Sequence, residues 1–271
     1  MPELPEVETT VRGLRPVLEG RRITSFQLNR ADLRWPFPPD LRQRLTGARV
    51  MSLGRRAKYG LIGTDRDDTL IFHLGMSGHW RIDPDAIGKH DHVVLETEDG
   101  RTLALNDHRR FGSLDIVRTD EIAAYPPFVK MGPEPLGDDF DGAYLKRALA
   151  GRVAPIKAML LDQKIVAGLG NIYVCDGLNL AGISPSREAG RITRPRLDRL
   201  ADAVKEVLTR AIAAGGSSLR DYVQPNGELG YFSSDWRVYG REDLPCPACD
   251  GVVKRRVDSG RSTFYCGRCQ K

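Results

Sequence analysis

Four cysteines near the end of the chain constrain its fold more than any other feature. Cys246 and Cys249 form one C-x2-C pair, and Cys266 and Cys269 form a second pair after sixteen intervening residues. This spacing is typical of a zinc ribbon or β-hairpin finger. Four thiolates complete a tetrahedral site with no open position, so the one expected Zn2+ is structural. The alternative is redox-active or disulfide-bonded cysteines, which a reducing compartment disfavours.

The segment between the two pairs predicts the finger itself. It reads DGVVKRRVDSGRSTFY, which contains two short strand patterns around the turn Asp258-Ser259-Gly260. Arg261 directly follows this turn. The fifth cysteine, Cys175, lies alone in an apolar helical segment, where we expect it to pack in a core.

Composition limits the class of protein. The chain has 271 residues, of which 41% are hydrophobic and 28% charged, which suits two folded domains and excludes bulk disorder. A net charge of +5 and a pI near 9.0 allow a polyanionic partner without requiring one. No apolar run is long enough to span a membrane, so no membrane partner is expected. No signal-peptide pattern is visible, and we expect a cytoplasmic protein.

The first half of the chain combines one helix with many strands. Pro5 suits the first turn of a helix. One apolar face of that helix follows at Val7, Val11, Leu14 and Leu18. From residue 22 to 118 the hydrophobic period is mostly two, and Asp99-Gly100 is a strong hairpin signal. Many short strands with close turns predict a β-sandwich or barrel.

The second half predicts helices. Residues 125–142 are rich in proline and glycine and predict a linker, whose central part we place at 131–140. Helical patterns follow at 141–149, at 155–163, from Asn171 as N-cap to Gly182, and from Thr193 to Gly215. A glycine-containing loop at 217–230 precedes the finger. The sequence therefore predicts an α+β protein with an N-terminal β-sandwich domain and flanking helices (1–130), a helical domain (141–236) and a zinc finger (237–271).

Two basic clusters suggest a nucleic-acid partner. GRRAKYG contains Lys58, and NDHRRFG contains Arg109 and Phe111. An arginine beside a phenylalanine is either an ordinary solvated face or a wedge that enters a kinked duplex. His90 and His92 have a spacing that a metal could use, but a phosphate contact or packing is the favoured interpretation.

The N-terminus, MPELPEVE, carries the most unusual chemistry. After removal of Met1, Pro2 has a secondary amine, which forms a permanently cationic iminium when it attacks an aldehyde-like carbon. An α-amine titrates near ~8, well below a lysine at ~10.4, so more of it is neutral. The alternative is that Pro2 only stabilises the terminus and that Glu3 is only a first-turn acid.

The motifs together resemble bacterial formamidopyrimidine-DNA glycosylases. MPELPEVET, RRAKY, HLGMSG, KHDH, RRFG, GPEPL, GLGNIY and FYCGRCQK occur in this order over nearly the full chain. The sister family, the endonuclease VIII-type glycosylases, shares the Pro-Glu start and the finger. ELPEVE, HLGMSG and GNIY favour the first family. The resemblance implies a helix–two-turn–helix domain between sandwich and finger.

The resemblance also implies catalytic roles for single residues. Pro2 matches the nucleophile that attacks C1′ of the damaged nucleotide, and Glu3 matches the acid/base that helps to open the sugar. Lys58 matches the lysine that transfers protons during β-elimination. Arg261 matches the finger arginine that contacts the 3′ phosphate and assists δ-elimination.

DNA contacts follow from the same comparison. Met76, Arg109 and Phe111 match the residues that fill the gap when a base is flipped out of the duplex. Asn171 opens a helix whose N-terminus suits a phosphate. His73, His90, Arg152, Lys157 and Tyr239 match further backbone or lesion-side contacts. The 217–230 loop matches the segment that closes over the lesion.

The implied function is the removal of oxidised purines, 8-oxoguanine and formamidopyrimidines, from damaged double-stranded DNA, followed by β,δ-elimination. We expect a monomeric bacterial protein that associates with the nucleoid. Two alternatives remain: an endonuclease VIII-like enzyme for oxidised pyrimidines, and a zinc-ribbon DNA-binding protein without catalysis. Val174 and Asp176 depart from the family pattern of Ala and Glu. The shorter Asp puts the local loop or phosphate geometry in doubt.

Overall fold

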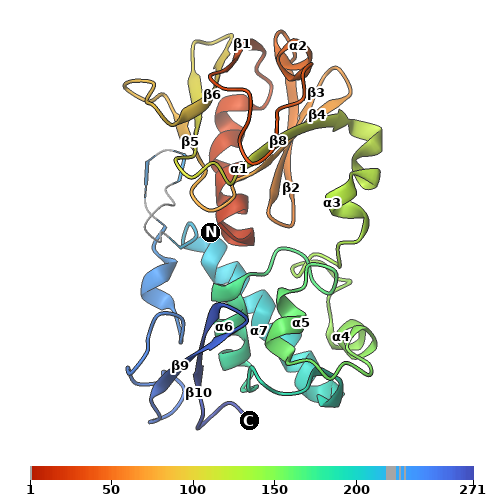
Figure 1. Ribbon diagram of the computed structural model, residues 1–271, viewed down its shortest axis with the longest axis vertical. Coiled ribbons are helices and arrows are strands. Elements are labelled where there is room, and N and C mark those ends of the chain that lie inside the picture. Colours follow the sequence, from red (N-terminus) through yellow and green to blue (C-terminus); the bar gives the residue numbers. More distant parts are fainter. Residues whose placement is uncertain (1, 218–223, 226, 229) are drawn as a thin grey trace. The chain divides into compact units, whose positions relative to one another are not determined.

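The computed structural model describes residues 2–217, 224–225, 227–228 and 230–271. The chain forms two compact units (Figure 1). Unit 1 contains Met1–Val129 and Ala214–Ser233, and unit 2 contains Lys130–Ala213 and Ser234–Lys271. The change of unit at residue 130 lies where the sequence placed the end of the first domain, whereas residues 214–233, which the sequence placed in the helical domain, belong to unit 1.

Unit 1 consists of two antiparallel four-stranded sheets and the long helix α1 (Figure 1). One sheet has the order β1-β6-β7-β5, and the other has the order β2-β3-β4-β8. Its helices are α1 (Leu4–Leu18), α2 (Leu41–Leu45), the 3-10 helix η1 (Thr119–Ala124) and α3 (Pro126–Val129). Its strands are β1 (Ile23–Leu28), β2 (Val50–Arg56), β3 (Tyr59–Thr64), β4 (Asp68–His73), β5 (His79–Ile82), β6 (Asp91–Thr97), β7 (Thr102–Asn106) and β8 (Ser113–Arg118).

The core of unit 1 joins both sheets to α1. Val7, Val11, Leu14 and Leu18 are buried in one cluster with inward residues of both sheets, such as Phe26 and Phe72. The apolar helical face and the period-two strands of the sequence therefore meet in one core, and the predicted α+β fold is confirmed. Burial of each such side chain contributes about 1.5–3 kcal/mol.

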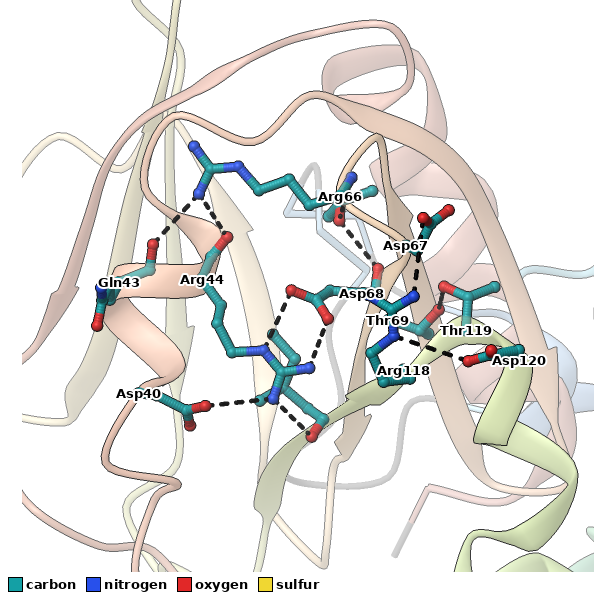
Figure 2. A network of polar contacts seen from close by, with 12 residues as sticks. Asp40, Gln43, Arg44, Arg66, Asp67, Asp68, Thr69, Arg118, Thr119 and Asp120 are labelled. Carbon is teal, nitrogen blue, oxygen red and sulfur yellow. Dashed lines mark hydrogen bonds and ion pairs between the residues drawn. The ribbon is translucent and has the colours of Figure 1, made fainter.

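A polar network fastens the short helix α2 to the second sheet (Figure 2). The guanidinium of Arg44 in α2 donates to Asp68 Oδ1 at 2.5 Å and to Asp68 Oδ2 at 3.1 Å. The Asp68 side chain is only 9% exposed, so the carboxylate of this bidentate pair is largely shielded from solvent. In the same network the hydroxyls of Thr69 and Thr119 lie 2.9 Å apart and join β4 to η1.

Unit 2 is helical and ends in a β-hairpin. Its helices are α4 (Gly142–Ala148), α5 (Ile156–Leu161), α6 (Asn171–Leu180), the 3-10 helix η2 (Ala189–Arg191) and α7 (Arg194–Ala213). The 3-10 helix η3 spans Phe232–Asp235, where the chain passes from one unit to the other. α7 packs against α4 and α6, and its apolar stripe is buried at Leu197, Leu200, Val204 and Leu208. No described helix is both long and apolar enough to cross a lipid bilayer.

The finger hairpin consists of β9 (Val253–Asp258) and β10 (Arg261–Cys266). Asp258 pairs with Arg261, so the turn has two residues, Ser259 and Gly260. Both have positive φ, 48° and 76°, as a tight turn of the I′ kind requires. The predicted turn is thereby observed, and Arg261 is the first residue after it.

Several elements differ from the sequence expectations. Among the described residues, α2 and β5 were not predicted, and α3 lies inside the segment assigned to the linker, with Phe128 buried. α3 is a single turn that packs its aromatic side chain against the rings of Tyr59 and Tyr125, a contact that local sequence does not reveal. Asn171 is the first helical residue of α6, and Gly170 is its N-cap.

Candidate active site and nucleic-acid interface

The N-terminal end of α1 fixes the residues expected to do the chemistry. Pro2 and Glu3 are both buried. The Glu6 carboxylate, 2% exposed, accepts the Glu3 N–H through Oε2 at 2.8 Å. Its other oxygen, Oε1, accepts the Ser217 N–H at 2.8 Å. One carboxylate therefore joins the start of the chain to the start of the 217–230 loop, whose residues 218–223, 226 and 229 lie outside the described part.

Lys58 lies in the two-residue turn between β2 and β3. It is 8% exposed, and Ala57 before it has φ of 52°, in the left-handed region. Arg55 holds this turn by donating to the Ala57 carbonyl at 2.8 Å and to Glu8 Oε2 in α1 at 3.1 Å. Burial alone would raise the pKa of Glu8, but hydrogen bonds from Arg12 and Arg55 outweigh it and lower the pKa. An ionised Glu8 thus connects α1 to the hairpin that carries Lys58.

His73 lies next to Lys58 at the end of β4. Burial lowers the pKa of His73 to about 4, and the positive charges of Lys58 and Arg34 add to this effect. Its Nδ1 accepts the Gly75 N–H at 3.1 Å, so the neutral ring carries its proton on Nε2. A neutral imidazole with one N–H donor between two cations is suited to bind a phosphate oxygen.

Two loops present the predicted wedge residues. Residues 74–78 carry Met76, and residues 107–112 carry Arg109 and Phe111. The Arg109 guanidinium lies over the Phe111 ring, 4.9 Å from its centroid, and Phe111 is 43% exposed. An exposed phenylalanine under an arginine is compatible with both interpretations, a solvated face and a wedge, so the wedge role stays a prediction.

The histidine pair behaves as the packing interpretation predicts. His92 is buried, and its Nε2 lies 2.9 Å from the Asp107 carbonyl. His90 is half-buried, with its ring 6.1 Å from that of His92 and 6.3 Å from that of His108. Within the described residues, the four cysteines are the only group of three or more potential ligands close enough to hold a metal.

In unit 2, the side chains of Asn171 and Lys157 form hydrogen bonds to the finger hairpin. Asn171 Nδ2 donates to the Ser262 carbonyl at 2.8 Å. The Lys157 ammonium donates to the same carbonyl at 3.1 Å and to Thr263 Oγ1 at 2.6 Å. Lys157 is 3% exposed, and burial lowers its pKa. The structure therefore gives the Lys157 amine protein partners, while the buried Asn171 Oδ1 has none among the described residues.

Arg261 and Arg152 are exposed cations. Arg261 follows the hairpin turn, and no carboxylate among the described residues forms an ion pair with it. Its neighbour Asp258 is engaged by Arg256 at 2.8 Å and by Thr263 at 2.6 Å. Arg152 lies in the exposed segment between α4 and α5. Both guanidinium groups are available to an anionic ligand.

Asp176 resolves the doubt that its short side chain raised. It is fully buried, and its carboxylate accepts N–H bonds from Arg237, Val238 and Tyr239 at 3.0, 3.0 and 3.1 Å. Burial raises the pKa of Asp176, and the three donors oppose this effect. The aspartate thus reaches the segment that leads into the finger and fixes Tyr239, whose ring packs on Phe264 at 5.0 Å.

The four finger cysteines fit a zinc ion. Their sulfur atoms all lie within 4.8 Å of one another. Such a donor set closes the coordination shell, so zinc there supplies folding energy and no reactive position. Asn179 of α6, 2% exposed, places its amide nitrogen 3.9 Å from the sulfurs of Cys246 and Cys269 and so supports the thiolate charge.

Sequence analysis missed two groups of this site. Arg34 acts electrostatically on His73 and Tyr59, and its backbone N–H donates to the Gly112 carbonyl at 3.0 Å. The exposed Trp35 ring lies 5.4 Å from its guanidinium. In the sequence, only the adjacent Arg34 and Trp35 in an irregular segment could have indicated this group. The Glu8–Arg55 pair was also missed, because it joins residues 47 positions apart.

Comparison with known proteins gives a consistent family. Three domain profiles match in order: the formamidopyrimidine-DNA glycosylase N-terminal domain over residues 1–114, its H2TH domain over residues 131–223, and the zinc finger found in FPG and IleRS over residues 243–271. The formamidopyrimidine-DNA glycosylases of Rhizorhabdus wittichii and Novosphingobium aromaticivorans are 69% and 63% identical to the chain, with 100% of both chains covered in each case.

Solved structures agree. The MutM (Fpg) protein of Thermus thermophilus is 41% identical, with a TM-score of 0.89 over 99% of this chain and 98% of that one. A Lactococcus lactis Fpg mutant, in complex with a Fapy-dG containing DNA, is 35% identical, with a TM-score of 0.92 over 100% of both chains. The three domain profiles, the full-length relatives and the shared fold together show that the chain belongs to the formamidopyrimidine-DNA glycosylase family.

Proposed function

We propose that this protein removes oxidised purines from damaged duplex DNA in base excision repair and then nicks the strand as an AP lyase. The observation that carries the proposal is the N-terminal end of α1. Pro2 and Glu3 are buried there, and Glu6 fixes the Glu3 backbone. Burial of a short, acidic N-terminal segment has a structural cost, which a nucleophile at that position would explain.

The amine of Pro2 would attack C1′ of the damaged nucleotide. The C1′–base bond breaks and the base leaves with its electron pair, while Glu3 protonates the sugar oxygen and opens the ring. The resulting iminium carries a positive charge that withdraws electrons from C2′. Loss of a C2′ proton then expels the 3′ phosphate, and a second elimination expels the 5′ phosphate.

Two cations would serve these eliminations. Lys58, next to the neutral His73, would transfer protons during the eliminations. Arg261, exposed and without an ion-pair partner among the described residues, would contact the 3′ phosphate and assist the second elimination. Hydrolysis of the iminium releases the sugar fragment and restores the free Pro2 amine.

The same surface residues would hold the bent duplex. Met76, Arg109 and Phe111 would fill the space of the flipped nucleotide, which costs a few kcal/mol to unstack. His73, His90, Arg152, Asn171 and Tyr239 would contact the backbone. We further propose that the protein acts as a monomer on the bacterial nucleoid in the cytoplasm. The Lactococcus lactis relative bound to Fapy-dG containing DNA supports an oxidised purine as the lesion.

Borohydride trapping tests this proposal directly. An N-terminal peptide extension turns the Pro2 amine into an amide, which is neither basic nor nucleophilic. Protease cleavage that leaves Pro2 as the first residue restores the amine and provides the matched control. We expect the cleaved protein, but not the uncleaved one, to form a covalent adduct at Pro2 with a duplex containing 8-oxoguanine.

Four results would contradict the proposal. Equal trapping before and after cleavage, or an adduct mapped to Lys58, would place the nucleophile elsewhere. Faster excision of an oxidised pyrimidine than of 8-oxoguanine or Fapy-dG would favour an endonuclease VIII-like preference. Binding without any excision would favour a DNA-binding protein that lacks catalysis.

A further inference from the structure

Asp107 lies fully buried directly after β7, and its carboxylate is shared between the two loops that carry the wedge residues. Oδ1 accepts the Ser77 hydroxyl at 2.5 Å, and Oδ2 accepts the Gly112 N–H at 2.8 Å. Ser77 belongs to the loop of Met76, whereas Gly112 belongs to the loop of Arg109 and Phe111. Each carboxylate oxygen thus accepts from a different loop.

Ser77 forms two hydrogen bonds to the loop of Arg109 and Phe111, one to Asp107 and one to Arg109. Ser77 is 1% exposed, and its side-chain oxygen also accepts the Arg109 N–H at 3.2 Å. The backbones approach closely as well, because a Cβ at Gly75 would lie 2.3 Å from the Phe111 carbonyl carbon. Hydrogen bonds and a close backbone approach therefore join the loop of Met76 to the loop of Arg109 and Phe111.

We propose that Asp107 and Ser77 form a wedge hub, a pair of positioning residues that presets the three wedge side chains before DNA binds. The hub touches no reacting atom. Its effect is confined to opening the duplex, since preorganised loops lose less conformational freedom when they enter the base stack. The inference rests on the proposed function, because it assumes that Met76, Arg109 and Phe111 unstack a damaged base pair.

Ser77→Ala is the sharpest test, since it removes the link between the loops and leaves the Asp107–Gly112 bond. Asp107→Asn is the second variant, because one of its two acceptors becomes a donor. Thr69→Val is the matched control, since Thr69 has an equally buried hydroxyl, paired with Thr119 in the network of Figure 2 and absent from the wedge loops.

Two substrates separate wedge function from chemistry. One is a duplex with 8-oxoguanine opposite cytosine, and the other is a single-stranded oligonucleotide with an abasic site, in which no base pair has to open. We expect Ser77→Ala to slow excision from the duplex about tenfold to a hundredfold, as loss of a buried hydrogen bond implies, with near wild-type nicking of the single strand. The ratio of the two rates within one preparation cancels any unfolded fraction.

A third measurement does not depend on catalysis. A 2-aminopurine placed beside the lesion in a duplex that cannot be cleaved becomes fluorescent when it unstacks. We expect a smaller and slower rise with Ser77→Ala and Asp107→Asn, and an unchanged rise with Thr69→Val. An unchanged rise with the hub variants, or an equal loss on both cleavage substrates, would overturn the wedge hub. Wild-type protein that unstacks 2-aminopurine without cleaving any lesion would instead refute the proposed chemistry.

Discussion

Lys58 and Arg261 each lie at a two-residue hairpin turn, but one is buried and the other is exposed. Lys58 lies in the two-residue turn between β2 and β3, and Arg261 follows the two-residue turn between β9 and β10. Each turn contains a non-glycine residue in the left-handed region, Ala57 and Ser259. Yet Lys58 is 8% exposed beside a neutral histidine, whereas Arg261 is exposed.

This difference in exposure suits two chemical roles, proton transfer for Lys58 and phosphate binding for Arg261. A lysine can give up its proton and so act as a general acid or base. An arginine keeps its charge at every physiological pH, and exposure leaves its donors free for a phosphate. The supports differ accordingly: ion pairing of Arg55 with Glu8 holds the first turn, and metal-bound thiolates with Lys157 hold the second.

Loss of the zinc should give the largest effect, because it should disrupt the turn before Arg261 and leave the turn of Lys58 intact. Cys266→Ser should release zinc and unfold the finger hairpin, since a structural zinc contributes about 10 kcal/mol or more to such a module. Duplex binding should be lost, while unit 1 keeps its fold and its Pro2 amine. Metal analysis and circular dichroism measure both. Cys175→Ala, at a buried cysteine outside the group, should keep one zinc, and a zinc-free but active wild type would refute the assignment.

Replacement of Lys58 should be next in size. Lys58→Ala should slow strand nicking about 10²- to 10⁴-fold, the usual contribution of a positioned acid/base group. Lys58→Arg keeps the charge but not the ability to transfer a proton, so it should bind abasic duplex normally and remain slow. Single-turnover nicking and binding titrations distinguish the two functions. Recovery of the rate in Lys58→Arg would show that only charge matters at the first turn.

His73 should make the first turn sensitive to acid. Its pKa of about 4 in the folded protein lies below the ordinary value of 6.5, so the unfolded chain takes up the proton first as the pH falls. Stability is therefore full above pH 6.5 and should fall by roughly 3 kcal/mol towards pH 4.

Denaturant unfolding at several pH values measures this loss, and His73→Phe should reduce it. His108→Gln, at an exposed position, should not. NMR titration should also show a higher His73 pKa in Lys58→Met, because one of the nearby positive charges is gone. An unchanged His73 pKa in that variant would show that the charge of Lys58 does not act on His73.

Arg261 should give the smallest effect. Arg261→Ala should slow the second elimination about tenfold and shift products from β,δ towards β alone, with zinc and the first elimination intact. Arg268→Ala is the matched control on the finger, where an exposed arginine lies 3.7 Å from Asp250. Product analysis on an abasic duplex decides the case. Equal product ratios for both variants would remove the distinction between the turns.

The sequence predicted the second turn better than the first. Asp258-Ser259-Gly260 carries its own local signal, and the cysteine spacing specifies what supports it. The strand alternation likewise predicted most of both sheets. The surroundings of Lys58 depend on Arg55, Glu8 and Arg34, which meet only after the sheets and α1 pack together. Local patterns carry no information on such contacts, which is also why β5 and the one-turn α3 escaped prediction.

The Glu6 carboxylate has a consequence for how the protein is made. It binds the N–H groups of Glu3 and Ser217, and Ser217 lies 211 positions from Glu6. A ribosome needs about 10 to 40 seconds to add that many residues. During this time the emerging chain contains Pro2 but lacks the hydrogen bond between Glu6 and Ser217. If Pro2 is the nucleophile, a nascent or truncated chain is an incomplete enzyme, and DNA is exposed to a strand-cutting activity only after synthesis is nearly finished.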